Sequence, residues 1–158
     1  LPYTYPRYSG VVMHYDHKQS ELINANTWKN DFFNPQYNFG FGLSYTAFEY
    51  SNINIEKSDY LLSEKDITIS VDIKNIGEIA GKEVVQLYAR DHFASISPPL
   101  RRLVRYNKVT LGAGETKTVS FTVNFEELGL YNYDNVWVNE PGKHSFYIDN
   151  LEATFNLK

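Results

Sequence analysis

His14, Asp16 and His17 are residue types that bind metal ions or transfer protons. If the segment GVVMHY, residues 10–15, is a strand that continues beyond Tyr15, His14 and Asp16 share one face and His17 points to the other. A metal site needs ligands that converge on one point, and the spacing offers no third ligand on the same side. We therefore expect no metal site here, and a polar surface or interdomain role instead.

The segment FGFGLS, residues 39–44, contains a Gly-x-Gly sequence, which opens the phosphate-binding loop of some nucleotide-binding proteins. No third glycine follows, and the residues after the segment read as a strand. Because such a loop needs the N-terminus of a helix to meet the phosphate, the pattern does not indicate nucleotide binding. We expect no cofactor.

Aromatic side chains crowd the first third of the chain. Sugar rings stack on exposed aromatic rings, so the segment from Trp28 to Tyr37 has two interpretations, a wall of a substrate path or a packed core. The candidate substrate-binding residues are Trp28, Phe32, Phe33 and Tyr37. Next comes NFGFGLSYTAFEY, residues 38–50, in which glycines between rings indicate close backbone approach. We expect its rings to be packed as a joint between two domains, namely Phe39, Phe41, Tyr45 and Phe48.

From about residue 47 onward, the chain alternates short strands and turns, and these are the elements that would position the candidate residues. DITISVDI, residues 66–73, alternates apolar and polar residues strictly, which predicts a half-buried strand. TVSFTV repeats the pattern and places Val119, Phe121 and Val123 inward. Two further strands are KEVVQLYAR and HSFYI, and NFEELGLY is one short helical turn. Glycine-containing turns follow at 75–81, 112–115 and 140–142. Together these signals predict an all-β antiparallel β-sandwich.

Length and composition narrow the class of protein further. The 158 residues allow one domain, or one domain with a fragment of another. A net charge of -4 with scattered Lys and Arg argues against a nucleic-acid partner. Cysteine is absent, which excludes disulfides, and no apolar run approaches the roughly 18 residues that span a membrane. The chain opens at Leu1 without a polar lead-in, so we expect it to be the C-terminal portion of a longer protein.

Several segments resemble glycoside hydrolase family 3, the β-glucosidase family, in the order found at its C-terminus. They are FGFGLSYTAFEY, VDIKNIGEIAGKEVVQLYARD, GETKTVSFTV and WVNEPGKHSFYI. Upstream, LPYTYPR and GVVMHYDHK are similar to the last strands of the family's second domain, an α/β sandwich. The resemblance spans nearly all of the chain. It departs from the family at YNFGFG, which lacks the usual Pro and second Tyr, and at Val11, where a Gln is common.

The resemblance implies two domains. Residues 1–46 would be the C-terminal end of the α/β sandwich catalytic domain with an interdomain linker. Residues 47–158 would be a fibronectin type III-like, immunoglobulin-like β-sandwich. The family's catalytic aspartate and glutamate lie upstream, so this chain would be the non-catalytic part of a retaining β-glucosidase that hydrolyses terminal non-reducing β-D-glucosyl residues. The expected partners are the upstream catalytic domains, a β-glucoside or oligosaccharide substrate and a second copy of the chain, in a periplasmic or secreted location.

The carboxylates of this chain agree with a non-catalytic role. A retaining glycosidase needs two carboxyl groups about 5 to 5.5 Å apart. Glu126 and Glu127 are adjacent and would point in different directions, and the aspartates are isolated, so we expect no catalytic residue here. Arg101 and Arg102 are candidates to pair with carboxylates of a neighbouring domain. The alternative is a free-standing fibronectin type III-like binding or adhesion module, which would not need the opening segment.

Overall fold

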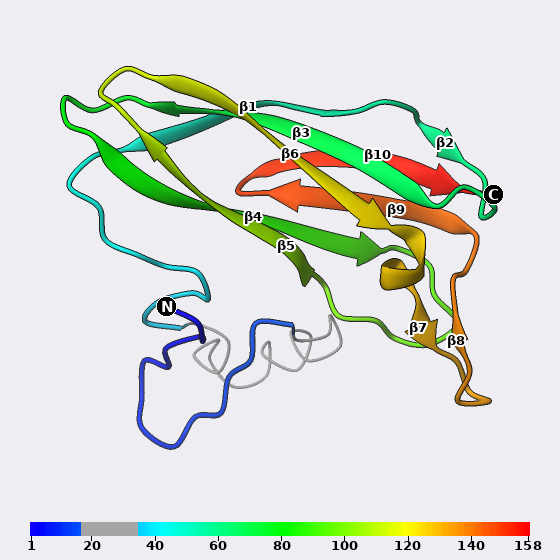
Figure 1. Cartoon of the computed structure of the whole chain (residues 1–158). Helices are drawn as coiled ribbons and strands as arrows, with labels where there is room; N and C mark the ends of the chain where they lie inside the picture. Colours follow the sequence, from blue (N-terminus) through cyan, green and yellow to red (C-terminus); the bar gives the residue numbers. More distant parts are fainter. Residues whose placement is uncertain (17–34) are drawn as a thin grey trace. The chain divides into compact units, whose positions relative to one another are not determined.

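The computed structural model describes residues 1–16 and 35–158 and divides the chain into two compact units (Figure 1). The first unit comprises residues 1–43 with 99–101, and the second comprises residues 44–98 with 102–158. All named strands of the described residues lie in the second unit. No helix within the described residues is long and apolar enough to cross a membrane.

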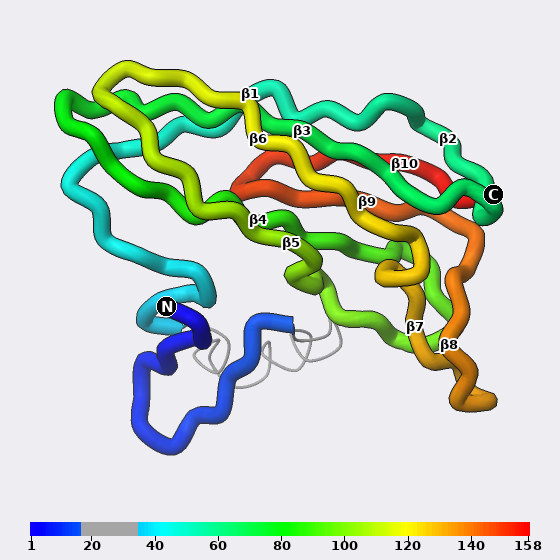
Figure 2. The backbone as a smooth tube through the Cα atoms, viewed as in Figure 1, coloured from blue at the N-terminus to red at the C-terminus, as the bar shows by residue number. Residues whose placement is uncertain are grey.

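Two β-sheets and a small hairpin build the second unit (Figure 2). The smaller sheet has the order β1 (Phe48–Ile55), β3 (Asp66–Asn75) and β6 (Thr116–Asn124). The larger sheet has the order β2 (Asp59–Tyr60), β10 (Leu151–Leu157), β9 (Gly142–Ile148), β4 (Gly81–Asp91) and β5 (Arg102–Leu111). A 3₁₀ turn, η2 (Phe125–Leu128), leads into the hairpin of β7 (Leu130–Tyr131) and β8 (Trp137–Val138). Neighbouring strands are antiparallel except β2 and β10, which are parallel.

One hydrophobic core lies between the two sheets and confirms the predicted β-sandwich. The apolar residues of β3 that alternate in sequence are all buried, and so are those of β6, including Phe121. The larger sheet contributes Leu87 from β4, Phe146 from β9 and Phe155 from β10 to the same cluster. Each such side chain contributes about 1.5 to 3 kcal/mol through burial. The strict alternation in the sequence therefore reports which face of each strand is covered.

Asn75, the last residue of β3, forms side-chain hydrogen bonds with the turns at one end of the sandwich. It is fully buried. Its Oδ1 accepts hydrogen bonds from Thr46 Oγ1 at 2.5 Å and from the Gly77 amide at 3.1 Å. Its Nδ2 donates to the carbonyls of Ile79 at 2.8 Å and Leu111 at 3.3 Å. The side chain thus fixes both the start of β1 and the turns that follow β3 and β5.

Two expectations for the opening segments are wrong within this chain. Residues 11–14 form no regular strand, although GVVMHY was expected to be one, and Val12 is exposed. Phe41 is exposed and Tyr45 is 100% exposed, so these two rings are not packed in a core. The sequence shows that aromatic rings are present but not whether the surface that covers them belongs to the same chain.

Candidate functional site

The first unit carries a row of four aromatic rings, which we call the aromatic row: Tyr3, Tyr5, Tyr37 and Phe41. The ring centroids of Tyr3 and Tyr5 lie 6.2 Å apart, and those of Tyr5 and Tyr37 lie 6.0 Å apart. Tyr37 stacks on Phe41 at 4.6 Å with an interplanar angle of 27°. Backbone hydrogen bonds hold Tyr5 and Tyr37 next to each other. The Tyr5 amide donates to the Tyr37 carbonyl at 2.9 Å, and the Tyr37 amide donates to the Tyr5 carbonyl at 3.3 Å.

Tyr37 is therefore the one sequence-predicted site residue whose surroundings are defined. It belongs to the aromatic row, all four members of which are between 39% and 51% exposed. The other three candidates, Trp28, Phe32 and Phe33, lie outside the described residues. A contiguous exposed aromatic surface is typical of a site that binds a protein or a ligand. The row offers ring faces for stacking or for packing, and none of its four members carries a carboxylate, an imidazole or an amine.

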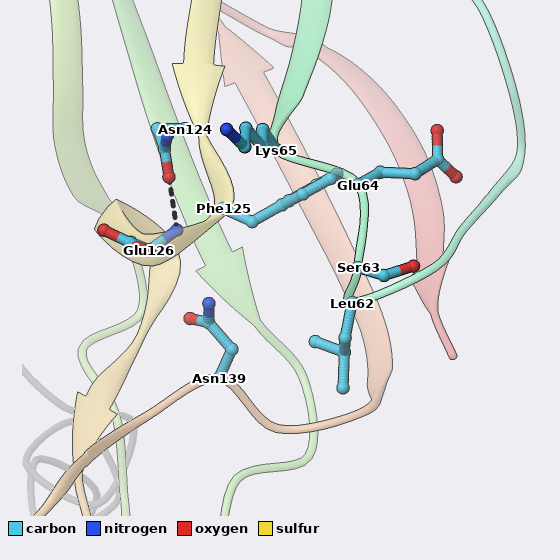
Figure 3. A pocket seen from close by; sticks show the side chains of 8 residues that line it. All are labelled: Leu62, Ser63, Glu64, Lys65, Asn124, Phe125, Glu126 and Asn139. Carbon is cyan, nitrogen blue, oxygen red and sulfur yellow. Dashed lines mark hydrogen bonds between the residues drawn. The ribbon is translucent and has the colours of Figure 1, made fainter.

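A hollow of about 370 Å³ opens in the second unit, between the segment before β3 and the segment after β6 (Figure 3). Its lining residues are Leu62, Ser63, Glu64, Lys65, Asn124, Phe125, Glu126 and Asn139. The two carboxylates that line it, Glu64 and Glu126, point away from each other. Glu64 turns outward and accepts a hydrogen bond from Lys57 Nζ at 2.5 Å, and Asn124 accepts from the Glu126 amide at 2.8 Å. The hollow therefore offers no pair of carboxylates for acid-base catalysis.

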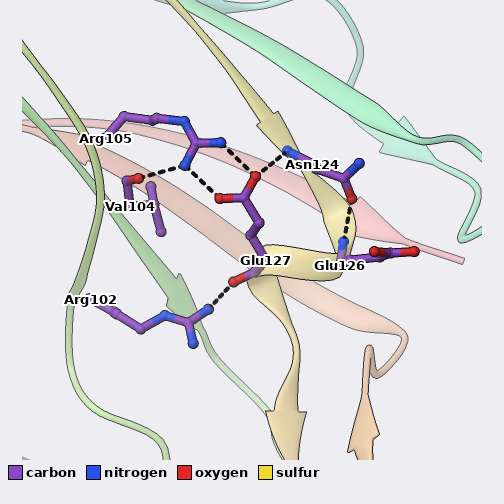
Figure 4. Close-up of polar contacts among 6 residues, drawn as sticks. All are labelled: Arg102, Val104, Arg105, Asn124, Glu126 and Glu127. Carbon is purple, nitrogen blue, oxygen red and sulfur yellow. Dashed lines mark hydrogen bonds and ion pairs between the residues drawn. The ribbon is translucent and has the colours of Figure 1, made fainter.

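Glu127 is held by two arginines, one at its carboxylate and one at its backbone carbonyl (Figure 4). Arg105 Nη1 and Nη2 donate to Glu127 Oε2 and Oε1, both at 2.5 Å. This bidentate contact lowers the pKa of the Glu127 carboxyl below its ordinary value. Glu126 points away from Glu127, as expected from their adjacency. Arg102 donates to the backbone carbonyls of Glu127 and Gly129, and its pairing with a neighbouring domain stays a prediction.

A Ser–His–Glu group that the sequence analysis missed is formed by Ser145 on β9, Glu152 on β10 and His92, the residue after β4. Ser145 Oγ is 2.8 Å from His92 Nε2 and donates to Glu152 Oε1 at 2.7 Å. In a catalytic triad the acid instead binds the second nitrogen of the histidine ring. Ser145 is also fully buried, and burial lowers the pKa of His92. The group is consequently a partly buried hydrogen-bond network and not a nucleophile site.

Metal-ligand residues do not gather in the part of the chain that the structure describes. Within residues 1–16 and 35–158, no three His, Asp or Glu side chains are placed to hold one ion. His14 and Asp16 lie in this part, whereas His17 does not.

Comparison with known proteins defines the class of the second unit and then the family of the chain. Residues 83–151 match the model of the fibronectin type III-like domain family, so the β-sandwich is a domain of that class. The chain is 40% identical over 124 residues to a β-xylosidase from Formosa agariphila, covering 78% of this chain and 17% of that protein. It is 37% identical over 156 residues to thermostable β-glucosidase B from Acetivibrio thermocellus, covering 98% and 20%.

A solved structure agrees with these relatives. A β-glucosidase from Erythrobacter marinus superposes with a TM-score of 0.89 at 30% identity, covering 98% of this chain and 21% of that one. The chain belongs to glycoside hydrolase family 3, as a portion that includes the family's fibronectin type III-like domain. It spans about a fifth of the length of the relatives that it matches.

Proposed function

We propose that this chain is the C-terminal, non-catalytic part of a retaining β-glucosidase. The whole enzyme would hydrolyse terminal non-reducing β-D-glucosyl residues by double displacement through a covalent glycosyl-enzyme. The observation that carries the proposal is the identity to β-glucosidase B across 98% of this chain and only a fifth of that protein. The same identity extends through residues before 47, which a free-standing adhesion module would not need.

The chain's own work in this enzyme is packing. The aromatic row is exposed here, and the catalytic domains are the surface that would cover its members other than Tyr37. Part of the opening region would remain in contact with substrate and form a wall of the outer subsites, through Trp28, Phe32, Phe33 and Tyr37. The homodimer and the periplasmic or secreted location remain predictions.

A chimeric enzyme tests the proposal. In β-glucosidase B, the fifth that matches this chain is replaced by the 158 residues, and hydrolysis of an aryl β-glucoside is measured. We expect the chimera to be soluble and active, the enzyme without this fifth to lose activity, and the isolated chain to have none. Turnover by the isolated chain, after removal of host glucosidases, would contradict the non-catalytic role. An inactive, well-folded chimera would contradict the proposal that this chain serves as the C-terminal part of a β-glucosidase.

Tyr37 tests the subsite wall in the same chimera. Loss of one stacked ring should weaken binding of a cello-oligosaccharide about three- to tenfold. Tyr37→Ala should therefore raise KM for cellotetraose and leave KM for a short aryl glucoside unchanged. The matched control is Tyr106→Ala, which removes an exposed ring from β5. Equal effects on both substrates, or equal effects of both variants, would remove Tyr37 from the proposed wall.

A further inference from the structure

The β7–β8 hairpin presents three aromatic side chains within seven residues, and we call them the hairpin platform: Tyr131, Tyr133 and Trp137. Tyr131 pairs with Trp137 across the hairpin, edge to face, with ring centroids 5.0 Å apart. Tyr133 lies in the turn between the strands. The exposed fractions are 57% for Tyr131, 85% for Tyr133 and 42% for Trp137. Exposed aromatic rings grouped on one short hairpin are typical of a site that binds a ligand or a partner.

The base of the platform is held in place by η2 and β5. Trp137 Nε1 donates to the Glu126 carbonyl at 2.8 Å, and the Arg102 guanidinium lies 6.0 Å from the Trp137 ring centroid. Gly129 is required at the entry to the hairpin, because a Cβ there would lie 2.6 Å from Trp137 Nε1. Binding to rings that are already fixed costs little conformational entropy.

The tip of the platform is fixed by a second set of hydrogen bonds. Asn132 Oδ1 accepts from the amides of Asp134 and Val136, both at 3.0 Å. Asn135 adopts the left-handed conformation, with φ of 58°, that closes the turn. Tyr133 is thus carried on an ordered turn and not on a loose loop.

We propose that the hairpin platform binds a neutral, β-linked oligosaccharide, through residues other than those of the outer-subsite wall proposed above. The apolar faces of two pyranose rings would stack on Tyr131 and Tyr133, and the Asp134 carboxylate would accept hydrogen bonds from sugar hydroxyls. The net charge of -4 and the acidic residue in the turn disfavour an anionic polymer. Polar residues alternate with the rings at the tip, which suits a hydroxylated ligand better than a dry protein interface. The choice of a glucan as ligand rests on the proposed function.

Native gel electrophoresis of the full 158-residue chain in gels with soluble barley β-glucan measures this binding. We expect the chain to be retarded in β-glucan and not in dextran, an α-linked glucan. Tyr133→Ala should weaken the apparent Kd about three- to tenfold, as expected for the loss of one stacked ring. Tyr133→Phe keeps the ring and should bind like the natural chain, and Tyr106→Ala, which removes a ring that is 70% exposed on β5, should also bind normally.

Three results would refute sugar binding at the hairpin platform. The natural chain could show no retardation in β-glucan, or it could be retarded equally in dextran. Tyr133→Ala could also bind as well as the natural chain while melting normally. Loss of binding in Tyr37→Ala with normal binding in Tyr133→Ala would place the sugar on the aromatic row instead. The readout is binding and not hydrolysis, so a failure of this inference can be told apart from a failure of the proposed function, which the chimera tests.

Discussion

Asn75→Ala should strongly destabilise the β-sandwich, because one buried side chain satisfies groups from three segments. Its four hydrogen bonds involve Thr46, Gly77, Ile79 and Leu111. Alanine would leave the Gly77 amide and the two carbonyls without this partner, at a position that is fully buried. A buried polar group without a partner costs more than a hydrogen bond contributes on average.

The size of the effect follows from these four bonds. Each contributes about 0.5 to 1.5 kcal/mol net, so the variant should lose about 2 to 6 kcal/mol of unfolding free energy. For a chain of this length, each kcal/mol moves Tm by about 4 °C, which gives a fall of about 8 to 24 °C. The start of β1 should loosen as well, because Thr46 loses its acceptor.

Urea unfolding followed by circular dichroism measures the loss. The matched control is Asn107→Ala, which removes an exposed asparagine from β5 and should stay within about 0.5 kcal/mol. Asn75→Asp keeps both acceptor contacts but cannot donate to the carbonyls of Ile79 and Leu111, so it should also destabilise. A loss below about 0.5 kcal/mol in Asn75→Ala would refute the view that this side chain holds the turns together.

Three further predictions concern the same unit. Phe121→Ala should cost about 3 to 5 kcal/mol in denaturant melts, and Thr122→Ala, on the exposed face of β6, should stay within about 0.5 kcal/mol; similar losses would show that a second layer covers the outer face. Burial raises the pKa of Glu83 above its ordinary 4.5, so its contribution to stability is present below that pH and is lost as pH rises through the folded pKa. Glu83→Gln should therefore make stability fall less steeply as pH rises. The difference should be less than about 1 kcal/mol, because the Glu83 carboxyl is partly solvated. A pH profile of Tm that is the same in the variant would exclude Glu83 as the cause of the fall. Residues 47–158 alone should melt more cooperatively than the full chain, and a broader transition in calorimetry would contradict this.

Much of the sandwich was predictable because burial in a half-covered strand leaves a period of two in the sequence. Ile67 and Phe121 are buried as their alternation indicates, and NFEELGLY contains the expected helical turn as η2. β10 was missed, although Leu151, Ala153, Phe155 and Leu157 alternate in the same way. The strand signal was therefore present in the sequence for this element too.

The candidate sites were less predictable, for a physical reason. Tyr45 and Phe41 carry the same aromatic signal as a buried ring, but burial depends on a surface that local sequence does not describe. The contacts of Arg102 within the chain were not predictable, because its acceptors are backbone carbonyls, which any sequence provides. The hairpin platform was missed because its rings come together through the pairing of β7 with β8.

Amide hydrogen exchange tests the central claim, that this chain is a supporting part whose first unit depends on the catalytic domains. The 158-residue chain and the active chimera with β-glucosidase B are compared under the same conditions. In the isolated chain, we expect fast exchange across Val11 to Tyr15 and slow exchange across Ile67 to Ile73. In the chimera, exchange across Val11 to Tyr15 should become slow. Slow exchange in this segment of the isolated chain, equal to that of Ile67 to Ile73, would show that the segment folds without its neighbours and would contradict the account.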